Sequence, residues 1–171
     1  MLIPDRDQDK VEKQAPAADR DVGPSISLRT SLLKLEKEFE RAKRNAAGLD
    51  KLLKIGALSK LEVEQRQLRV VHLEFELANA RLVAAKEQIL ERDQQLSAGA
   101  IAKADVTPAE NNLALAIEAA HAAGVKREQA DIAAAEANVQ RQEKLLALGS
   151  ARKKDVERAL QKLAALKARE N

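Results

Sequence analysis

The sequence has few of the residues that usually fill a thick protein interior. Its 171 residues include no cysteine, tryptophan or tyrosine, and its two phenylalanines are Phe39 and Phe75. Without cysteine the chain has neither disulfides nor thiolate metal ligands. Because large rings normally fill deep cores, their scarcity favours thin contacts between helices, which small and medium aliphatic side chains can fill. We therefore expect an elongated molecule.

An excess of one charge and a long apolar run are also lacking. The 30 basic and 27 acidic side chains alternate along the chain, whereas a nucleic-acid binder usually carries a basic stripe with aromatic stacking groups. We therefore expect no nucleic-acid partner. No apolar run approaches the ~20 residues of a membrane span, and the first seven residues lack the apolar stretch of a signal peptide. From these residues alone a cytoplasmic location is expected.

The N-terminal segment differs in composition from the rest. Residues 1–24 hold Pro4, Pro16 and Pro24, many charges and few apolar side chains. Such a segment cannot bury enough surface to offset the entropy of ordering it. The sequence predicts a disordered tail at 1–24 and a helical domain at 25–171.

The domain is rich in Ala, Leu, Lys, Glu, Arg and Gln, which favour helices and coiled coils. We predict an all-α fold of long amphipathic helices that pack as antiparallel coiled-coil hairpins. The helices are expected at about 27–55, 60–97, 107–148 and 153–168.

Heptad spacing of apolar residues supports these helices. The first seam is Leu28, Leu32, Leu35, Phe39, Ala42, Ala46, Leu49 and Leu53. The second is Leu61, Leu68, Phe75, Leu82, Ile89 and Leu96, with Val71, Ala78 and Ala85 between them and Glu64 and Arg92 as polar interruptions. In the third stretch the apolar phase changes near Gly124, which predicts a rotated seam or a bend.

The joints between the helices repeat one pattern. Gly56, Gly99 and Gly149 are each followed by small residues, a basic residue, and an acid that precedes valine. Glycine can take the left-handed conformation that ends a helix. Ser59 with Glu62 forms a capping box for the second helix, and Thr107 before Pro108 predicts the start of the third. No matching box follows Gly149, so both a turn and a continuous helix remain open there.

The chain offers few candidates for chemistry. His72 and His121 are isolated and lack the spacing of metal-binding pairs. The glycines are scattered singly, so no phosphate-binding loop is predicted. We expect no cofactor, no metal site and no enzymatic activity.

The first joint resembles the hairpin tip of the HlyD-type periplasmic adaptor (membrane fusion) proteins. That family's tip carries an arginine, a leucine four positions later and a serine seven positions after that. Leu52 and Ser59 match the leucine and serine around Gly56, although Gly48 stands at the arginine position. In the third repeat Arg141 and Leu145 match the arginine and leucine, and Arg152 replaces the serine.

The second joint, residues 99–110, is similar to a pattern in the helical barrel of TolC-like outer-membrane efflux channels, where Gly, Asp-Val and Ala-Glu precede a long helix. Together the resemblances imply a helical hairpin module that docks helix to helix with an efflux channel or adaptor in the periplasm or cell envelope. They imply partner contacts at Leu52, Gly56, Ser59, Arg141 and Leu145.

A second hypothesis follows from the heptads without the resemblance. Seams of this length also suit a cytoplasmic structural coiled coil that self-associates as a homo-oligomer and has no transport role.

Overall fold

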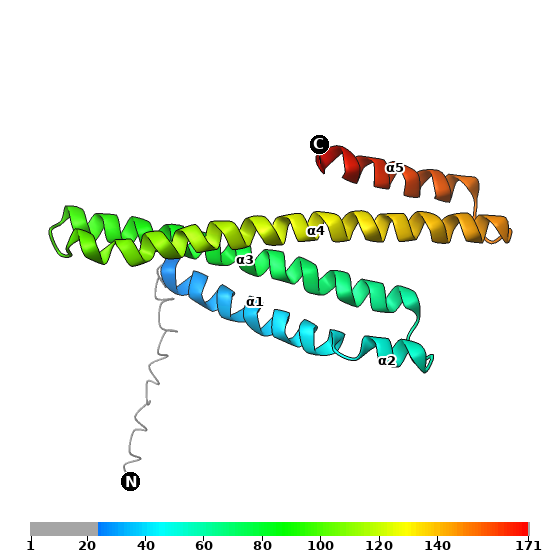
Figure 1. Cartoon of the computed structure of the whole chain (residues 1–171), viewed down its shortest axis with the longest axis horizontal. Coiled ribbons are helices and arrows are strands. Elements are labelled where there is room, and N and C mark those ends of the chain that lie inside the picture. The colour runs from blue at the N-terminus through cyan, green and yellow to red at the C-terminus, as the bar shows by residue number, and fades with distance from the viewer. Residues whose placement is uncertain (1–23, 171) are drawn as a thin grey trace, which may run out of the picture.

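The computed structural model describes residues 24–170, and these residues form helices joined by short turns (Figure 1). The helices are α1 (Pro24–Ala46), α2 (Leu49–Lys54), α3 (Lys60–Ser97), α4 (Thr107–Ala147) and α5 (Lys153–Glu170), with a 3₁₀ turn at Lys103–Asp105. No strand occurs within this range, so the predicted all-α class is confirmed. The predicted disordered tail lies outside the described residues, apart from Pro24.

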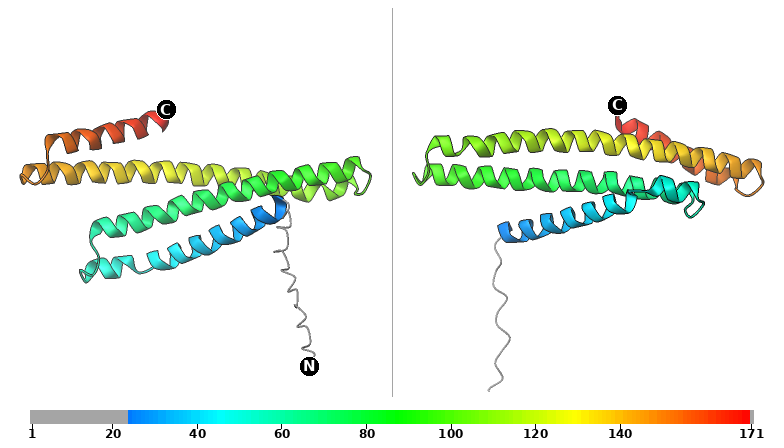
Figure 2. Two further views of the ribbon diagram at one scale, coloured as in Figure 1. Left: turned by 180° about the vertical axis from the view of Figure 1, so that it is seen from behind. Right: turned by 60° about the horizontal axis from the view of Figure 1, so that its bottom comes forward.

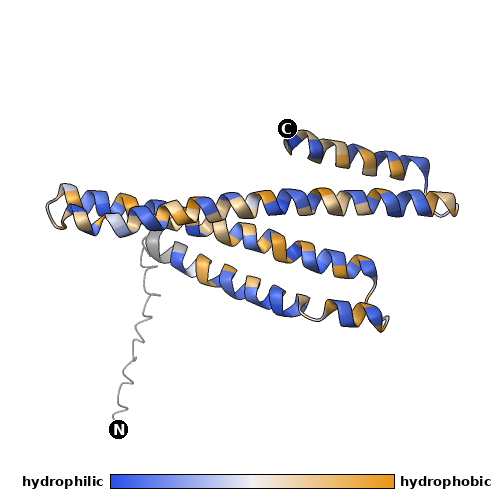
Figure 3. Ribbon diagram, viewed as in Figure 1, coloured by the Kyte–Doolittle hydropathy of each residue, from blue (hydrophilic) through white to orange (hydrophobic). Residues whose placement is uncertain are grey.

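The helices lie side by side in the order α1, α3, α4, α5, with α2 continuing the line of α1 (Figures 1 and 2). The turns after α2, α3 and α4 reverse the chain, so the neighbouring long helices are antiparallel. At 1.5 Å per residue α3 and α4 are about 57 and 62 Å long, and α4 runs the length of the molecule (Figure 1). The result is an elongated array of hairpins in which apolar and polar residues alternate along each helix (Figure 3).

The predicted helix at 27–55 is interrupted, which corrects the sequence analysis. Gly48 takes a left-handed conformation (φ 86°) between α1 and α2. The heptad spacing hides this break because Ala46 and Leu49 keep the expected interval across it. Leu49, directly after the break, is only 2% exposed, and α2 contacts α3. The interruption thus lets the last turn of this segment settle onto α3.

The three repeated glycines end their helices in the same way. Gly56, Gly99 and Gly149 have φ values of 73°, 70° and 72°. In each turn the glycine N–H donates to the carbonyl three residues back, and the next N–H donates to the carbonyl five residues before it, at 2.8 to 3.0 Å. This pair of bonds is the Schellman motif. The structure therefore settles the open choice at Gly149 in favour of a turn.

The helix that follows each turn starts at a fixed offset from the glycine. The carboxylates of Glu62, Asp105 and Asp155, six residues after their glycines, accept hydrogen bonds from the backbone N–H three residues before them, at 2.8, 3.0 and 3.3 Å. The predicted start of α4 at Thr107 is confirmed, although Val106 rather than Thr107 occupies the capping position and no side chain caps the helix there. Asp155 supplies part of the box that was not recognised after Gly149.

The second predicted seam describes only part of the packing of α3. Its most buried side chains include Val63, Leu73 and Leu77, which lie off that seam, whereas Leu61 is 41% exposed. The reason is that α3 packs against two helices, α1 and α4, and so needs two apolar stripes. A single heptad track cannot describe a helix with two partners.

Of the two arrangements predicted near Gly124, a rotated seam or a bend, the packing of α4 fits the rotated seam. α4 is continuous through Gly124, and its C-terminal part packs against α5 as well as α3. The second apolar phase therefore serves a second partner. Gly124 itself faces Phe75 of α3, where an added methyl would lie 3.5 Å from the ring.

We expect Gly124→Ala to stabilise the protein by about 0.5 to 1 kcal/mol, because alanine favours the helix interior and its methyl would make ordinary contact with Phe75. Gly99→Ala should instead destabilise it by about 1 kcal/mol, since φ is positive there. Thermal unfolding followed by circular dichroism tests both. Equal effects of the two substitutions would contradict the assigned conformations.

Candidate docking site

The residues selected by resemblance lie at two turns at the same end of the molecule. The α2–α3 turn contains Leu52, Gly56 and Ser59, and the α4–α5 turn follows Arg141 and Leu145. Both turns lie at the end opposite the α3–α4 turn in each view (Figures 1 and 2). We call the segments 50–62 and 143–155 tip 1 and tip 3, and the segment 93–105 at the opposite end tip 2.

Leu52 and Leu145 have the same role in their two tips. Each lies four residues before the glycine, and its carbonyl accepts the Schellman bond that spans five residues. The donors are the N–H groups of Ala57, at 2.9 Å, and of Ser150, at 2.8 Å. Their side chains remain 38% and 40% exposed. The backbone of each leucine is therefore fixed by the turn, while part of its side chain is free for contact.

Ser59 begins α3 through a complete capping box. The Ser59 hydroxyl accepts from the N–H of Glu62 at 3.2 Å, and the Ser59 N–H donates to the Glu62 carboxylate at 2.8 Å. The bond from this backbone N–H, followed by one from the Ser59 hydroxyl, lowers the pKa of Glu62 below its ordinary value. Ser59 is thus a structural residue first, and its exposed position at the turn leaves room for a partner.

Arg141 connects the two hairpins at this end. Its guanidinium pairs with the carboxylate of Glu64, which lies in the second turn of α3. The side chains are 33% and 25% exposed, so this ion pair is half-buried. The contact explains the polar interruption of the predicted seam at Glu64, and it fixes tip 3 relative to the start of α3.

Two further polar contacts between α3 and α4 were missed by the sequence analysis. His72 Nε2 lies 2.7 Å from Asp131 Oδ1, and Lys126 pairs with Glu74. With the Glu64–Arg141 pair they form a ladder along the hairpin, in which the α4 residue number falls as the α3 number rises. Charged residues at the heptad positions beside the seam indicate that such pairs form, but the sequence does not determine which residues pair.

An aromatic contact lies at one end of this ladder, beside the Glu74–Lys126 pair. The Arg127 guanidinium carbon lies 4.0 Å from the centroid of the Phe75 ring. The Arg127 Nε is buried and lacks a hydrogen-bond partner among the described residues. An arginine stacked over a ring is favourable, and the glycine at 124 leaves space for the ring. Phe75 therefore fixes the register of α4 on α3.

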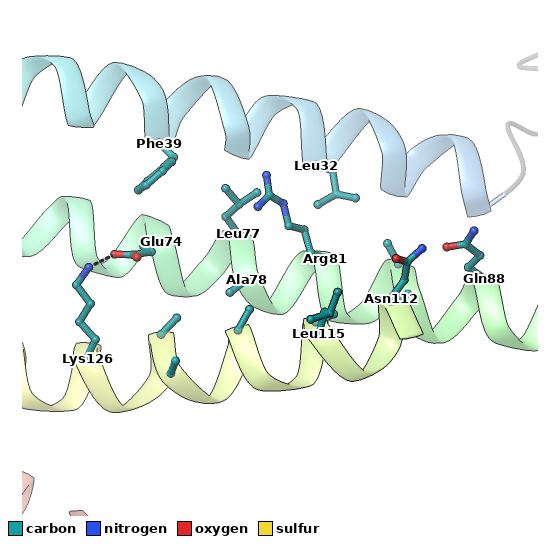
Figure 4. A pocket seen from close by; sticks show the side chains of 16 residues that line it. Leu32, Phe39, Glu74, Leu77, Ala78, Arg81, Gln88, Asn112, Leu115 and Lys126 are labelled. Atoms are coloured by element: carbon teal, nitrogen blue, oxygen red, sulfur yellow. Dashed lines mark hydrogen bonds and ion pairs between the residues drawn. The ribbon is translucent and has the colours of Figure 1, made fainter. Parts of the chain in front are cut away.

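An open groove of about 740 Å³ lies between α1 and α4, with α3 as its floor (Figure 4). Leu32 and Phe39 of α1 and Leu77 of α3 point into it, and alanines of α4 form much of the other wall. The charged residues that line it, Glu74, Arg81 and Lys126, are held in ion pairs, Arg81 with Glu36 at 2.9 Å. The groove is suited to helix packing.

The described residues also limit other kinds of site. They contain no group of three or more metal-ligating side chains, and none of their helices has the length and apolar content to cross a membrane. Comparisons with protein-family models, with curated proteins and with solved structures find no match to this chain. The resemblance to HlyD-type adaptors and TolC-like channels therefore stays a prediction.

Ser59→Ala should destabilise the protein by about 1 kcal/mol through loss of the cap, whereas Ser150→Ala, one residue after a turn glycine, should change stability by less than about 0.5 kcal/mol.

The lowered pKa of Glu62 means that its carboxylate stabilises the fold at pH values above the ordinary pKa of glutamate. This contribution is lost as the pH falls through the lowered pKa. The melting temperature of Glu62→Gln should therefore fall below the parent's at neutral pH and match it in acid.

Phe75→Ala should destabilise the hairpin by about 3 kcal/mol, because the ring packs on Gly124 and beneath Arg127. A double-mutant cycle with Phe75→Leu and Arg127→Met should give a coupling energy of about 1 kcal/mol. Denaturant unfolding of the four proteins supplies both values. Strictly additive effects would show that the ring and guanidinium do not interact.

Proposed function

We propose that this chain is a non-catalytic helical hairpin module that acts by helix-to-helix docking in a transport assembly of the cell envelope. The proposed partner is an efflux channel or adaptor, as the resemblance to HlyD-type and TolC-like proteins implies. The observation that carries the proposal is the pair of partly exposed leucines, Leu52 and Leu145, at equivalent positions in the two tips of one end.

The geometry of the tips supports this role. A turn whose backbone hydrogen bonds are satisfied internally can approach another protein without first breaking them. Gly56 adds no side chain to tip 1, and nothing lies within 4 Å of the position where its Cβ would be, so a partner could approach the backbone there. Arg141 holds tip 3 to α3 through Glu64. The two leucines would therefore be presented on supported turns, which reduces the entropy lost on docking.

The alternative is a structural coiled coil that self-associates in the cytoplasm. The observation that favours it is the open groove between α1 and α4, whose apolar lining a helix of a second copy could cover. In that case the contact surface would be the side of the array, and the tips would have no binding role.

Binding to a candidate channel or adaptor separates these functions. Leu52→Asp and Leu145→Asp should each weaken binding at least about tenfold, because a charge would have to be desolvated at the contact. Ser59→Asp keeps a good capping residue while it adds charge to tip 1. Helix content and melting temperature should be measured in parallel, since only folded variants are informative.

The matched control is Gln95→Asp, because Gln95 has the equivalent position in tip 2 and accepts from Ala100 at 2.9 Å. It should bind like the parent. If the folded tip variants all bind like the parent while sedimentation shows a stable oligomer of the chain, the docking proposal fails and the structural coiled coil is supported.

A further inference from the structure

The three tips share one turn but differ in the residue directly before the glycine. This residue is Ile55 in tip 1 and Leu148 in tip 3, which are 74% and 78% exposed. In tip 2 it is Ala98. The two largest exposures among the exposed aliphatic side chains thus fall at the same repeat position, and both belong to the same end of the molecule (Figure 2).

The charges of the tips follow the same division. Tips 1 and 3 together hold seven basic and four acidic side chains, and tip 2 holds one basic and two acidic side chains. Two of the four acids, Glu62 and Asp155, are engaged by the backbone N–H groups of the caps. The basic residues of the two-tip end are Lys51, Lys54, Lys60, Lys144, Arg152, Lys153 and Lys154, all exposed.

We infer that the two-tip end docks on the surface of an anionic lipid bilayer, with Ile55 and Leu148 entering the interfacial layer and the surrounding basic side chains contacting the headgroups. Each of these convex turns has one aliphatic side chain that is far more exposed than the others, Ile55 or Leu148. Such side chains do not need a matching cavity, and a planar surface can receive both. Exposed aliphatic groups ringed by lysine and arginine are the combination that anionic interfaces attract.

The turn geometry makes this docking inexpensive for the protein. The Schellman bonds and the caps satisfy several backbone N–H groups at tips 1 and 3, which lowers the cost of moving these turns out of water. Tip 2 has the same backbone but lacks both the large aliphatic residue and the basic surplus. The contrast assigns the surface property to the side chains rather than to the turn. The inference is independent of the protein partner proposed above.

The test is co-sedimentation of the full chain with vesicles of phosphatidylcholine containing about one third phosphatidylglycerol, with pure phosphatidylcholine vesicles alongside. We expect binding to the anionic vesicles that weakens as salt is added, and little binding to the neutral ones. Ile55→Ser combined with Leu148→Ser should weaken binding about tenfold or more. Helix content should stay unchanged, because both side chains are exposed.

The repeat supplies matched charge variants. Lys60, Lys103 and Lys153 each lie four residues after the turn glycine. Lys60→Gln and Lys153→Gln should each reduce binding to anionic vesicles about fivefold. Lys103→Gln and Ala98→Ser, in tip 2, should bind like the parent.

Three results would overturn the inference. The parent could fail to bind anionic vesicles, the tip 1 and tip 3 variants could bind like the parent, or the tip 2 variants could lose as much affinity. If the parent ignores vesicles while Ile55→Ser with Leu148→Ser abolishes binding to a channel or adaptor, the two-tip end is a protein contact, and the docking proposal stands without the lipid surface. If the parent binds anionic vesicles but does not bind a channel or adaptor, the lipid surface is supported and the docking proposal fails.

Discussion

The left-handed glycine is the constraint on which the rest of this structure depends. Three times the chain reaches a glycine with φ near 70° and reverses, with the same two backbone bonds closing the turn. Without the reversals the heptad stripes would have no partner within the chain, because the long helices bury their apolar sides chiefly against their neighbours in the row. The repeated acid six residues later then starts the next helix, so turn and restart form one unit.

Within the α3–α4 hairpin, the apolar seam does not determine the alignment by itself. Heptads of leucine and alanine allow neighbouring registers of similar energy, because the pattern repeats every two turns. The specific choice comes from Phe75 opposite Gly124 and Arg127, and from the pairs Glu64–Arg141 and His72–Asp131. These glycine, aromatic and polar contacts thus select the register of the hairpin, and the aliphatic residues stabilise it. They also place tip 3 beside the start of α3, which brings the two tips to one end.

Much of this fold follows from local rules that the sequence displays. The bounds of α3, α4 and α5 follow from helix-ending glycines and heptad spacing, and the predictions differ from the structure by at most two residues. The heptad pattern does not predict the break at Gly48, because the apolar interval is preserved across it. The sequence shows Ile55 and Leu148 at a shared position before the glycine. The tip pattern of the adaptor family does not include that position, so the resemblance does not select them. The partner of His72 depends on the interhelical register, which no local pattern contains.

A row of helices in which contacts run chiefly between neighbours does not unfold as one body. The outer helices each pack substantially on one long helix, α5 on α4 and α1 on α3. The inner helices, α3 and α4, each pack on two. In an array of this kind stability is roughly a sum of unit and interface contributions. The outer helices should therefore open first, so amide hydrogen exchange would be fastest in α5 and α1 and slowest at the centre of the α3–α4 hairpin. The molecule would then exist partly as a frayed population whose exposed inner stripes are transiently available to other helices.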